Sequence, residues 1–467
     1  MFTVAHDQAH AQAPAPAVGR PRPAAATRVR RASVLDSARV CAHVFAPMIA
    51  QGVVLRRPRL LGLAARRDSA RRANALLADL RRTYGAGPLA VSVFGRLVVL
   101  PLCAADARAV LGRTPDPFTP ANREKRAALD HFEPHALLVT PGPERPGRRR
   151  FNEAVLGTPH GAHHLAGTFL DVVREEIATM SSQLAADSVL EWPTFHAAFS
   201  RIVRRIVLGD GAAGDRALTK QLDALRADAN WAFAHRRRTG IHDRFTARLR
   251  THLDRAEPGC LAAVVAHTDH DDDTDPAGQV PHWLFAYDAA AIAAFNTLTL
   301  LAAHPEAAAQ AREDLIHRDP ADPHVLATAQ HLRACVQESL RLWPTTLVIL
   351  RDAERADQLA PDGAAVAVIS SFFHRDRETL DFADRFAPAA WLDGRADPAR
   401  GIVPFSAGPA ACPGRNLVLF TVTAVVDAVL RETAALRPTG RTVLDRDRSL
   451  PHTLDHTATR LLAPPAG

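Results

Sequence analysis

The chain of 467 residues contains almost no lysine. Lys125 and Lys220 are the only two, so nearly all of its positive charge is arginine. The formal net charge is +7. Because alanine is also abundant, this bias is typical of a GC-rich genome and gives little support to nucleic-acid binding. A basic excess equally suits the docking of an acidic protein partner. We therefore expect no nucleic acid among the partners.

Cysteine is scarce and scattered. The five cysteines form no Cys-x-x-Cys pair, and they stand at Cys41, Cys103, Cys260, Cys335 and Cys412. This spacing argues against a disulfide framework and against a zinc site. We expect a protein of the reducing cytoplasm.

Large apolar residues are rare in residues 1–32, which are rich in Ala, Pro and Arg. Such a segment buries too little apolar surface to fold, and it lacks the apolar stretch of a signal peptide. We predict a disordered leader over 1–32 and one large domain over 33–467. Residues 40–55 are apolar in places but too short to span a bilayer. We expect them to pack on the body, near a membrane or the substrate entrance.

Long apolar runs are rare too, and the longest covers residues 283–303. By length alone it could span a membrane. Polar residues interrupt it at Asp288, Asn296, Thr297 and Thr299. A central core helix explains them better, and we expect no transmembrane segment.

No flavin or nicotinamide fingerprint is present. The Gly-x-Gly pair at 85–87 precedes a predicted strand, whereas a dinucleotide loop follows one. No reductase module is therefore fused to this chain within the sequence.

The periodicity of apolar residues predicts a mainly α fold with a small β part. Helical spacing covers 68–83, 165–184, 195–208, 218–234, 243–254 and 261–267. Alternating or buried runs predict strands at 90–94, 97–100, 347–350 and 365–369, the first two joined as a hairpin. Residues 114–143 are predicted to form a long irregular loop.

A cysteine lies among glycines and prolines just ahead of an apolar helix. The segment contains Phe405, Gly408, Cys412 and Gly414. The free N–H groups at a helix start favour a thiolate, and glycines let the backbone approach a ligand closely. A lone axial thiolate on heme iron fits this pattern, with the phenyl ring covering one side of the flat cofactor. A buried structural cysteine at a helix start is the alternative.

The spacing of these four residues closely resembles the cysteine loop of the cytochrome P450 family of heme-thiolate monooxygenases. The resemblance implies a single large domain with a long central helix over heme b, and Cys412 as the iron ligand. It also implies that one oxygen atom from dioxygen is inserted into a small organic substrate. A separate ferredoxin and ferredoxin reductase would supply the electrons, and bacterial specialised metabolism would be a typical role.

The run 283–303 resembles the family's helix that crosses the heme. Aligned on the segment 300–306, the family's acid falls on Asp288 and its threonine on Ala289. The resemblance implies a proton relay at Asp288. Because Ala289 lacks a hydroxyl, a heme-thiolate peroxygenase, isomerase or oxidative-coupling enzyme stays open. So does a non-catalytic heme-binding protein.

Glu338 and Arg341 stand at i,i+3 on a predicted helix, where a charge pair can form. They resemble the family's Glu-x-x-Arg element, which supports the heme side structurally. An arginine normally completes that element, but Ala390 stands in its place. Either Arg385, Arg395 or another residue substitutes, or the pair stands alone.

The resemblance also implies basic contacts to the heme propionates. Arg148 or a neighbour is one candidate, Arg351 is a second, and His374 is a weaker third. The family often has a basic residue two positions before the cysteine, where this chain has Ala410. The loop 114–143 and the segment 452–454 are expected to cover the pocket.

Overall fold

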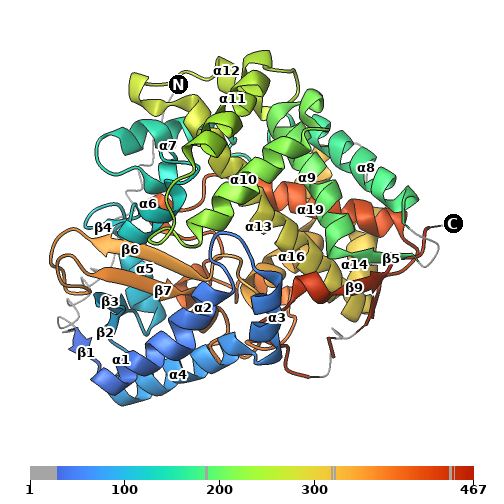
Figure 1. The fold of residues 1–467 in the computed structure, drawn as a ribbon. Helices are drawn as coiled ribbons and strands as arrows, with labels where there is room; N and C mark the ends of the chain where they lie inside the picture. The colour runs from blue at the N-terminus through green and yellow to red at the C-terminus, as the bar shows by residue number, and fades with distance from the viewer. Residues whose placement is uncertain are drawn as a thin grey trace, which may run out of the picture.

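The computed structural model describes residues 29–184, 188–316, 319, 322–440, 444–445 and 448–466. It is mainly helical, with a six-stranded sheet and a three-stranded sheet. The larger sheet lies at one side of the molecule and most helices lie at the other (Figure 1). The predicted fold class is confirmed.

The larger sheet has the strand order β1-β2-β3-β7-β6-β4. Its hairpin joins β2 (Leu89–Val93) to β3 (Arg96–Leu100), as predicted. The strand β1 (Arg30–Arg31) pairs parallel to β2. The predicted boundary between a leader and one large domain at residue 33 stays a prediction. Residues 1–28 lie outside the described part of the chain.

The sheet continues through β7 (Ala365–Ile369), which pairs antiparallel with β6 (Val348–Ala353). The strand β4 (Phe118–Thr119) closes the edge. The smaller sheet contains β5 (Val189–Glu191), β8 (Arg437–Thr439) and β9 (Arg460–Leu462). Short continuous apolar runs had predicted β6 and β7 as buried strands.

Five helices that apolar periodicity predicted between residues 165 and 267 are confirmed, with ends shifted by a few residues. They are α8 (Ala166–Ser182), α9 (Trp192–Leu208), α10 (Arg216–Ala229), α11 (Thr239–Arg255) and α12 (Leu261–His267). Their apolar faces form the main core cluster, because each buries one stripe of side chains.

The remaining helices lie around this core and the sheet. They are α1 (Val34–Val40), α2 (Ala46–Ala50), α3 (Pro58–Arg66), α4 (Ser69–Tyr84), α5 (Ala104–Gly112), α6 (Arg123–Leu129), α7 (Glu144–Val155), α14 (Pro305–Ile316), α15 (Pro323–Thr328), α16 (Gln330–Leu342), α17 (Ser370–His374), α18 (Ala389–Leu392) and α19 (Arg415–Glu432). The predicted irregular loop 114–143 is wrong in part, since it contains β4, α6 and a 3-10 turn at Leu137–Val139.

The helix α13 (Pro276–Ala303) crosses the middle of the molecule (Figure 1). It contacts α9, α16 and α19. In the described part of the chain it is the one helix long and apolar enough to cross a membrane. Its most apolar window is 72% buried, as expected for a core helix. The side chain of Asp275 caps its first turn by accepting from the Gly278 N–H.

Candidate functional site

The cysteine loop is held by its own backbone. The Cys412 N–H donates to the Phe405 carbonyl over 2.9 Å. Gly408 has a φ of +68°, and a Cβ there would lie 2.2 Å from the Leu111 carbonyl oxygen at the end of α5. A side chain at Gly408 would therefore push the loop off α5.

The Cys412 thiol is partly buried just before α19. Burial raises its pKa, while a hydrogen bond from the Gly414 N–H and the charges of Arg149 and Arg415 act in the opposite direction. The Gly414 N–H and the two arginines therefore favour the thiolate form of Cys412 once a metal ion replaces its proton. A Cβ at Gly414 would meet only Leu156 at 3.7 Å, so this glycine matters here for its N–H.

Two arginines contact the cysteine loop. Arg149 donates to the Ala411 carbonyl over 2.6 Å. The exposed Arg415 places its guanidinium 5.9 Å from the centroid of the Phe405 ring. Phe405 is partly buried against the main core cluster. The loop thus carries positive charge at its surface and an aromatic ring within.

One face of α13 borders internal space. Phe285, Asp288, Ala289 and Ile292 are only partly buried, although residues 293–302 after them are almost all buried. Their spacing of three to four residues places them on one side of the helix. The residues aligned with the family's acid and threonine therefore lie at this opening.

The Asp288 carboxylate is hydrogen-bonded to two basic residues from neighbouring helices. It accepts from Arg226 over 2.6 Å and from His196 over 2.9 Å. Burial alone would raise the pKa of Asp288, but the Arg226 guanidinium and His196 outweigh it and hold that pKa well below its usual range. The carboxylate is ionised, and it must exchange a partner before it can pass a proton.

The Glu338–Arg341 pair forms as predicted and is completely buried. Two parallel hydrogen bonds of 2.7 and 2.6 Å join the guanidinium to the carboxylate. Arg341 also donates to the carbonyls of His374, Ala383, Phe382 and Arg385. The helix α16 is thereby tied to the segment 374–385.

Trp391 takes the place of the missing arginine. Its indole nitrogen donates to Glu338 over 2.9 Å, and the Ala387 N–H donates to the same carboxylate over 2.9 Å. Arg385 donates instead to Asp381, and Arg395 pairs with Asp381 and Asp393. Neither of the two predicted substitutes contacts Glu338. The family's residue at this place is charged, so the sequence pattern does not indicate a neutral tryptophan one position further on.

Three cations lie together near the cysteine loop, the buried Arg145 and Arg351 and the partly buried Lys125. Arg351 donates to Ser406 over 3.2 Å and to Thr114 over 3.0 Å. Burial lowers the pKa of Arg351 to about 10, and the charge of Arg145 adds to this. Burial likewise lowers the pKa of Arg145 to about 10. The pKa of Lys125 lies well below its usual value because of burial and repulsion from both arginines.

This cluster of Lys125, Arg145 and Arg351 is short of negative charge. Among the described residues, no carboxylate lies within 4 Å of any of the three. Glu124 and Asp352 are near Lys125, but both already pair with Arg96. All three donate to neutral oxygens of the protein, such as the carbonyls of Pro120 and Leu137. Because charges removed from water are costly without a counter-charge, the site is suited to a ligand with carboxylates.

Arg148 and His374 have partners within the protein. Arg148 donates to the carbonyls of Asp273 and His135 and to the Thr140 hydroxyl, and it pairs with Glu144. His374 is buried, and its Nε2 accepts from the Val403 N–H over 3.0 Å.

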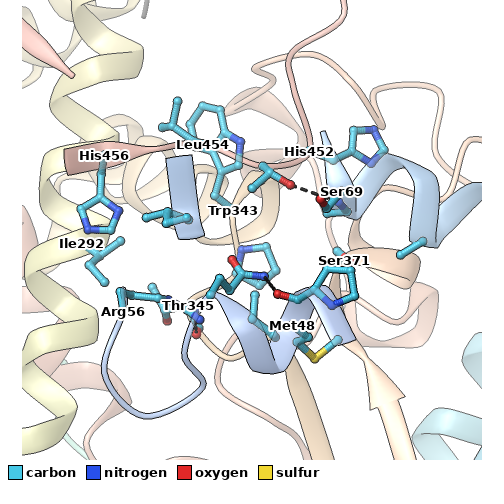
Figure 2. A pocket seen from close by; sticks show the side chains of 18 of the residues that line it. Met48, Arg56, Ser69, Ile292, Trp343, Thr345, Ser371, His452, Leu454 and His456 are labelled. Atoms are coloured by element: carbon cyan, nitrogen blue, oxygen red, sulfur yellow. Dashed lines mark hydrogen bonds between the residues drawn. The ribbon is translucent and has the colours of Figure 1, made fainter. Parts of the chain in front are cut away.

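A pocket with about 730 Å³ of empty space, part of it open to solvent, lies beside α13 (Figure 2). Ile292 and Asn296 line it from α13, and Met48 lines it from the segment 40–55. The predicted return of 452–454 is confirmed, since these residues form another wall together with His456. The pocket begins one helical turn beyond Ala289 and does not include Cys412.

These observations fit a heme with two propionates. The cationic cluster can bind the two carboxylates, and Cys412 offers one sulfur as a ligand for the iron. The α13 opening provides internal space. Only Cys412 and Arg351 of this set were predicted from the sequence. Lys125 and Arg145 were missed because they reach the site from α6 and α7, far from the cysteine in the chain.

The comparisons with known proteins agree with this site. The family model described as "Cytochrome P450" matches residues 260–451. A cyclooctat-9-en-7-ol 5-monooxygenase from Streptomyces melanosporofaciens is 31% identical over 230 residues, which are 44% of this chain and 50% of that protein. Cytochrome P450 714C3 from Oryza sativa subsp. japonica is 32% identical over 160 residues, which are 32% of this chain and 31% of that one. The chain thus matches half or less of the length of these relatives.

Solved structures match over more of the chain. A retinoic acid-bound cyanobacterial CYP120A1 has a TM-score of 0.66 at 15% identity, covering 82% of this chain and 92% of that one. The heme domain of cytochrome P450DA has a TM-score of 0.68 at 14% identity, covering 85% and 92%. At this identity the likeness shows the fold. The chain therefore has the fold of the cytochromes P450, and its residues 260–451 are similar to that family.

Proposed function

We propose that this protein is a heme-thiolate monooxygenase that inserts one oxygen atom from dioxygen into a small organic substrate. The observation that carries the proposal is the juxtaposition of the Cys412 loop with the cations Lys125, Arg145 and Arg351. A thiolate ligand and a carboxylate-binding cluster are the two features that a protein needs to hold heme by its iron and its edge.

The proposed cofactor is heme b. Cys412 would be the axial ligand, and Arg351, Arg145 and Lys125 would hold the propionates. Phe405 would shield one side of the cofactor near the sulfur. When bound, a heme with thiolate ligation supplies the chemistry of O–O bond cleavage. Arg148 and His374 stay predictions as further contacts.

In this proposal, the residues at the α13 opening supply protons for the reaction. Asp288 can deliver a proton when His196 or Arg226 releases it, since each holds one carboxylate oxygen. Ala289 offers no hydroxyl for the last hydrogen bond. We propose that the substrate or an ordered water provides it.

We propose a separate ferredoxin and ferredoxin reductase as electron donors. The exposed Arg415 and the neighbouring Arg149 put positive charge beside the cysteine loop, where an acidic ferredoxin would shorten the electron path. A bacterial enzyme of specialised metabolism, acting in the cytoplasm, fits the arginine-rich composition and the similarity to the Streptomyces enzyme.

Ala289 favours a second candidate function. A heme-thiolate peroxygenase, isomerase or oxidative-coupling enzyme needs no dioxygen-derived proton relay at that position. A non-catalytic heme-binding protein would need only Cys412 and the cationic cluster.

Isotope labelling separates these functions. A substrate is first found by a spectral screen, in which a bound compound displaces the water on the iron. Turnover with ferredoxin, reductase and ¹⁸O₂ should then place one ¹⁸O atom in the product. Turnover only with hydrogen peroxide would favour a peroxygenase, and an unlabelled rearranged product would favour an isomerase. No turnover under either condition would favour the binding protein.

A further inference from the structure

The inference begins with Asn296, which lies two turns beyond Ala289 on α13. Its side chain is 98% buried, since only 2% is exposed, and it lines the pocket of Figure 2. Its Oδ1 has no hydrogen-bond partner among the described residues. Buried polar groups are nearly always bonded, and an orphaned one costs about 1–3 kcal/mol. A ligand or a water must therefore satisfy it.

His456 is the second free polar group of this pocket. Figure 2 shows its ring near Ile292, and its short 3-10 helix contacts α13. The ring packs edge-on against Trp192 with centroids 4.5 Å apart, and no hydrogen bond joins its nitrogens to a described residue. Burial lowers the pKa of His456 to about 3, so the imidazole is neutral near pH 7. A neutral ring can donate from one nitrogen and accept at the other.

Several other polar groups of the pocket are already engaged. Gln51 donates to the Pro47 carbonyl, Ser371 to Asn74, and Thr453 accepts from the Ala70 N–H. Arg56 donates to the carbonyls of Gly52 and Thr345. The rest of the lining is mostly apolar, with Met48, Leu61 and Leu347 as examples. The pocket thus has a mostly apolar lining, in which the Asn296 oxygen is the one fully buried polar atom without a partner among the described residues.

We propose that Asn296 and His456 together bind the hydroxyl group of an apolar alcohol, and that this hydroxyl orients the substrate for oxidation beside Ala289. This proposal rests on the proposed monooxygenase function and adds its substrate class. The Asn296 oxygen requires a donor, and His456 can return a hydrogen bond to the same oxygen. Seven residues of α-helix span about 10 Å, so the hydroxyl lies roughly that far from the carbon that is oxidised.

Matched ligands test the proposal with the heme-loaded protein. Dissociation constants are measured from the heme spectrum for 1-dodecanol, its methyl ether and dodecanoic acid, and for geranylgeraniol and its methyl ether. In the wild type, at least one alcohol should bind about tenfold more tightly than its ether, because the ether has no proton for Asn296. Asn296→Leu and His456→Phe should each reduce that preference to less than twofold.

Ile292→Val is the matched control, because it changes the same wall without removing a polar group. It should change the affinities for alcohol and ether by the same factor. Equal binding of alcohol and ether by the wild type would overturn the proposal and assign Asn296 a bound water. Tighter binding of the acid would overturn it in favour of a carboxylate at Arg56.

Two further outcomes separate this proposal from the function on which it rests. If no alcohol binds while the reduced carbon monoxide complex has a thiolate-type spectrum, the substrate class is wrong and the heme-thiolate function stands. If that spectrum is absent, the proposed function itself fails. The wild-type comparison needs no variant, so poor folding of Asn296→Leu would not prevent a decision.

Discussion

The Trp391 indole nitrogen donates to a carboxylate oxygen of Glu338, 2.9 Å away, at the position next to the one where the family places an arginine. A neutral donor thus completes a buried ion pair. The Glu338 carboxylate then accepts from Arg341, Ala387 and Trp391, which satisfies both of its oxygens. A buried charge is tolerated when hydrogen bonds and a counter-charge satisfy all of its polar atoms.

Trp391→Phe should destabilise the protein by about 1–3 kcal/mol, because it removes one donor from a buried carboxylate and keeps most of the ring packing. Urea unfolding and heme content measure the effect. Arg385→Ala and Arg395→Ala are the controls, since both side chains are bonded elsewhere at the surface. If either control costs more than Trp391→Phe, an arginine supports Glu338 after all.

Glu338→Ala should be more severe, at about 3–5 kcal/mol, because Arg341 would remain buried without its counter-charge. We expect little folded, heme-loaded protein from this variant. A melting temperature and heme content equal to the wild type would show that the pair is incidental.

The sequence predicted the helices and strands well where periodicity was strong, as in α9, α12 and the β2–β3 hairpin. It also predicted the i,i+3 pair of Glu338 and Arg341, because that contact is local. It could not predict contacts that tertiary packing creates. The partners of Asp288 come from α9 and α10, 92 and 62 residues away.

The cationic cluster should hold the cofactor through its charge. Lys125→Met and Arg351→Met keep much of the side-chain length but remove the charge, so each should weaken heme retention. We expect transfer of heme to apomyoglobin to become about tenfold faster or more, since each lost charge-assisted bond contributes about 1.5–3 kcal/mol. Lys220→Met is the control, because that lysine lies on α10 outside the cluster. Unchanged transfer rates in both variants would remove the cluster from the heme site.

Proton delivery can be separated from electron delivery at α13. Asp288→Asn should slow ferredoxin-driven turnover about tenfold or more while sparing peroxide-driven turnover, because hydrogen peroxide brings its own protons whereas dioxygen must receive them through the enzyme. Ala289→Thr should improve coupling for non-native substrates more than for the native one. The rates of product formation with ferredoxin and with peroxide measure the first effect, and product formed per NADPH consumed measures the second. Equal loss of both activities in Asp288→Asn would assign the carboxylate a structural role with Arg226.

Acid should destabilise the fold through its buried histidines. Burial lowers the pKa of His374 and His456 to about 3 and that of His452 to about 4. The unfolded chain, with histidine pKa values near 6.5, therefore binds more protons between about pH 6.5 and 4. Stability is complete above that window and falls within it, by up to about 1.4 kcal/mol per pH unit for each histidine.

Urea unfolding at pH 7, 6 and 5 measures this slope. His456→Phe should reduce the pH dependence of the free energy of unfolding by roughly the contribution of one histidine. A slope that does not change in the variant would mean that His456 is protonated in the folded protein.

The reduced carbon monoxide difference spectrum tests the central claim, that Cys412 is the axial ligand of a heme. The wild type should show the red-shifted Soret band of thiolate ligation, and Cys412→Ser should abolish it. Cys41→Ser, Cys103→Ser, Cys260→Ser and Cys335→Ser should each keep it. A wild-type spectrum of the histidine-ligated type, or a thiolate band that persists in Cys412→Ser, would contradict the account.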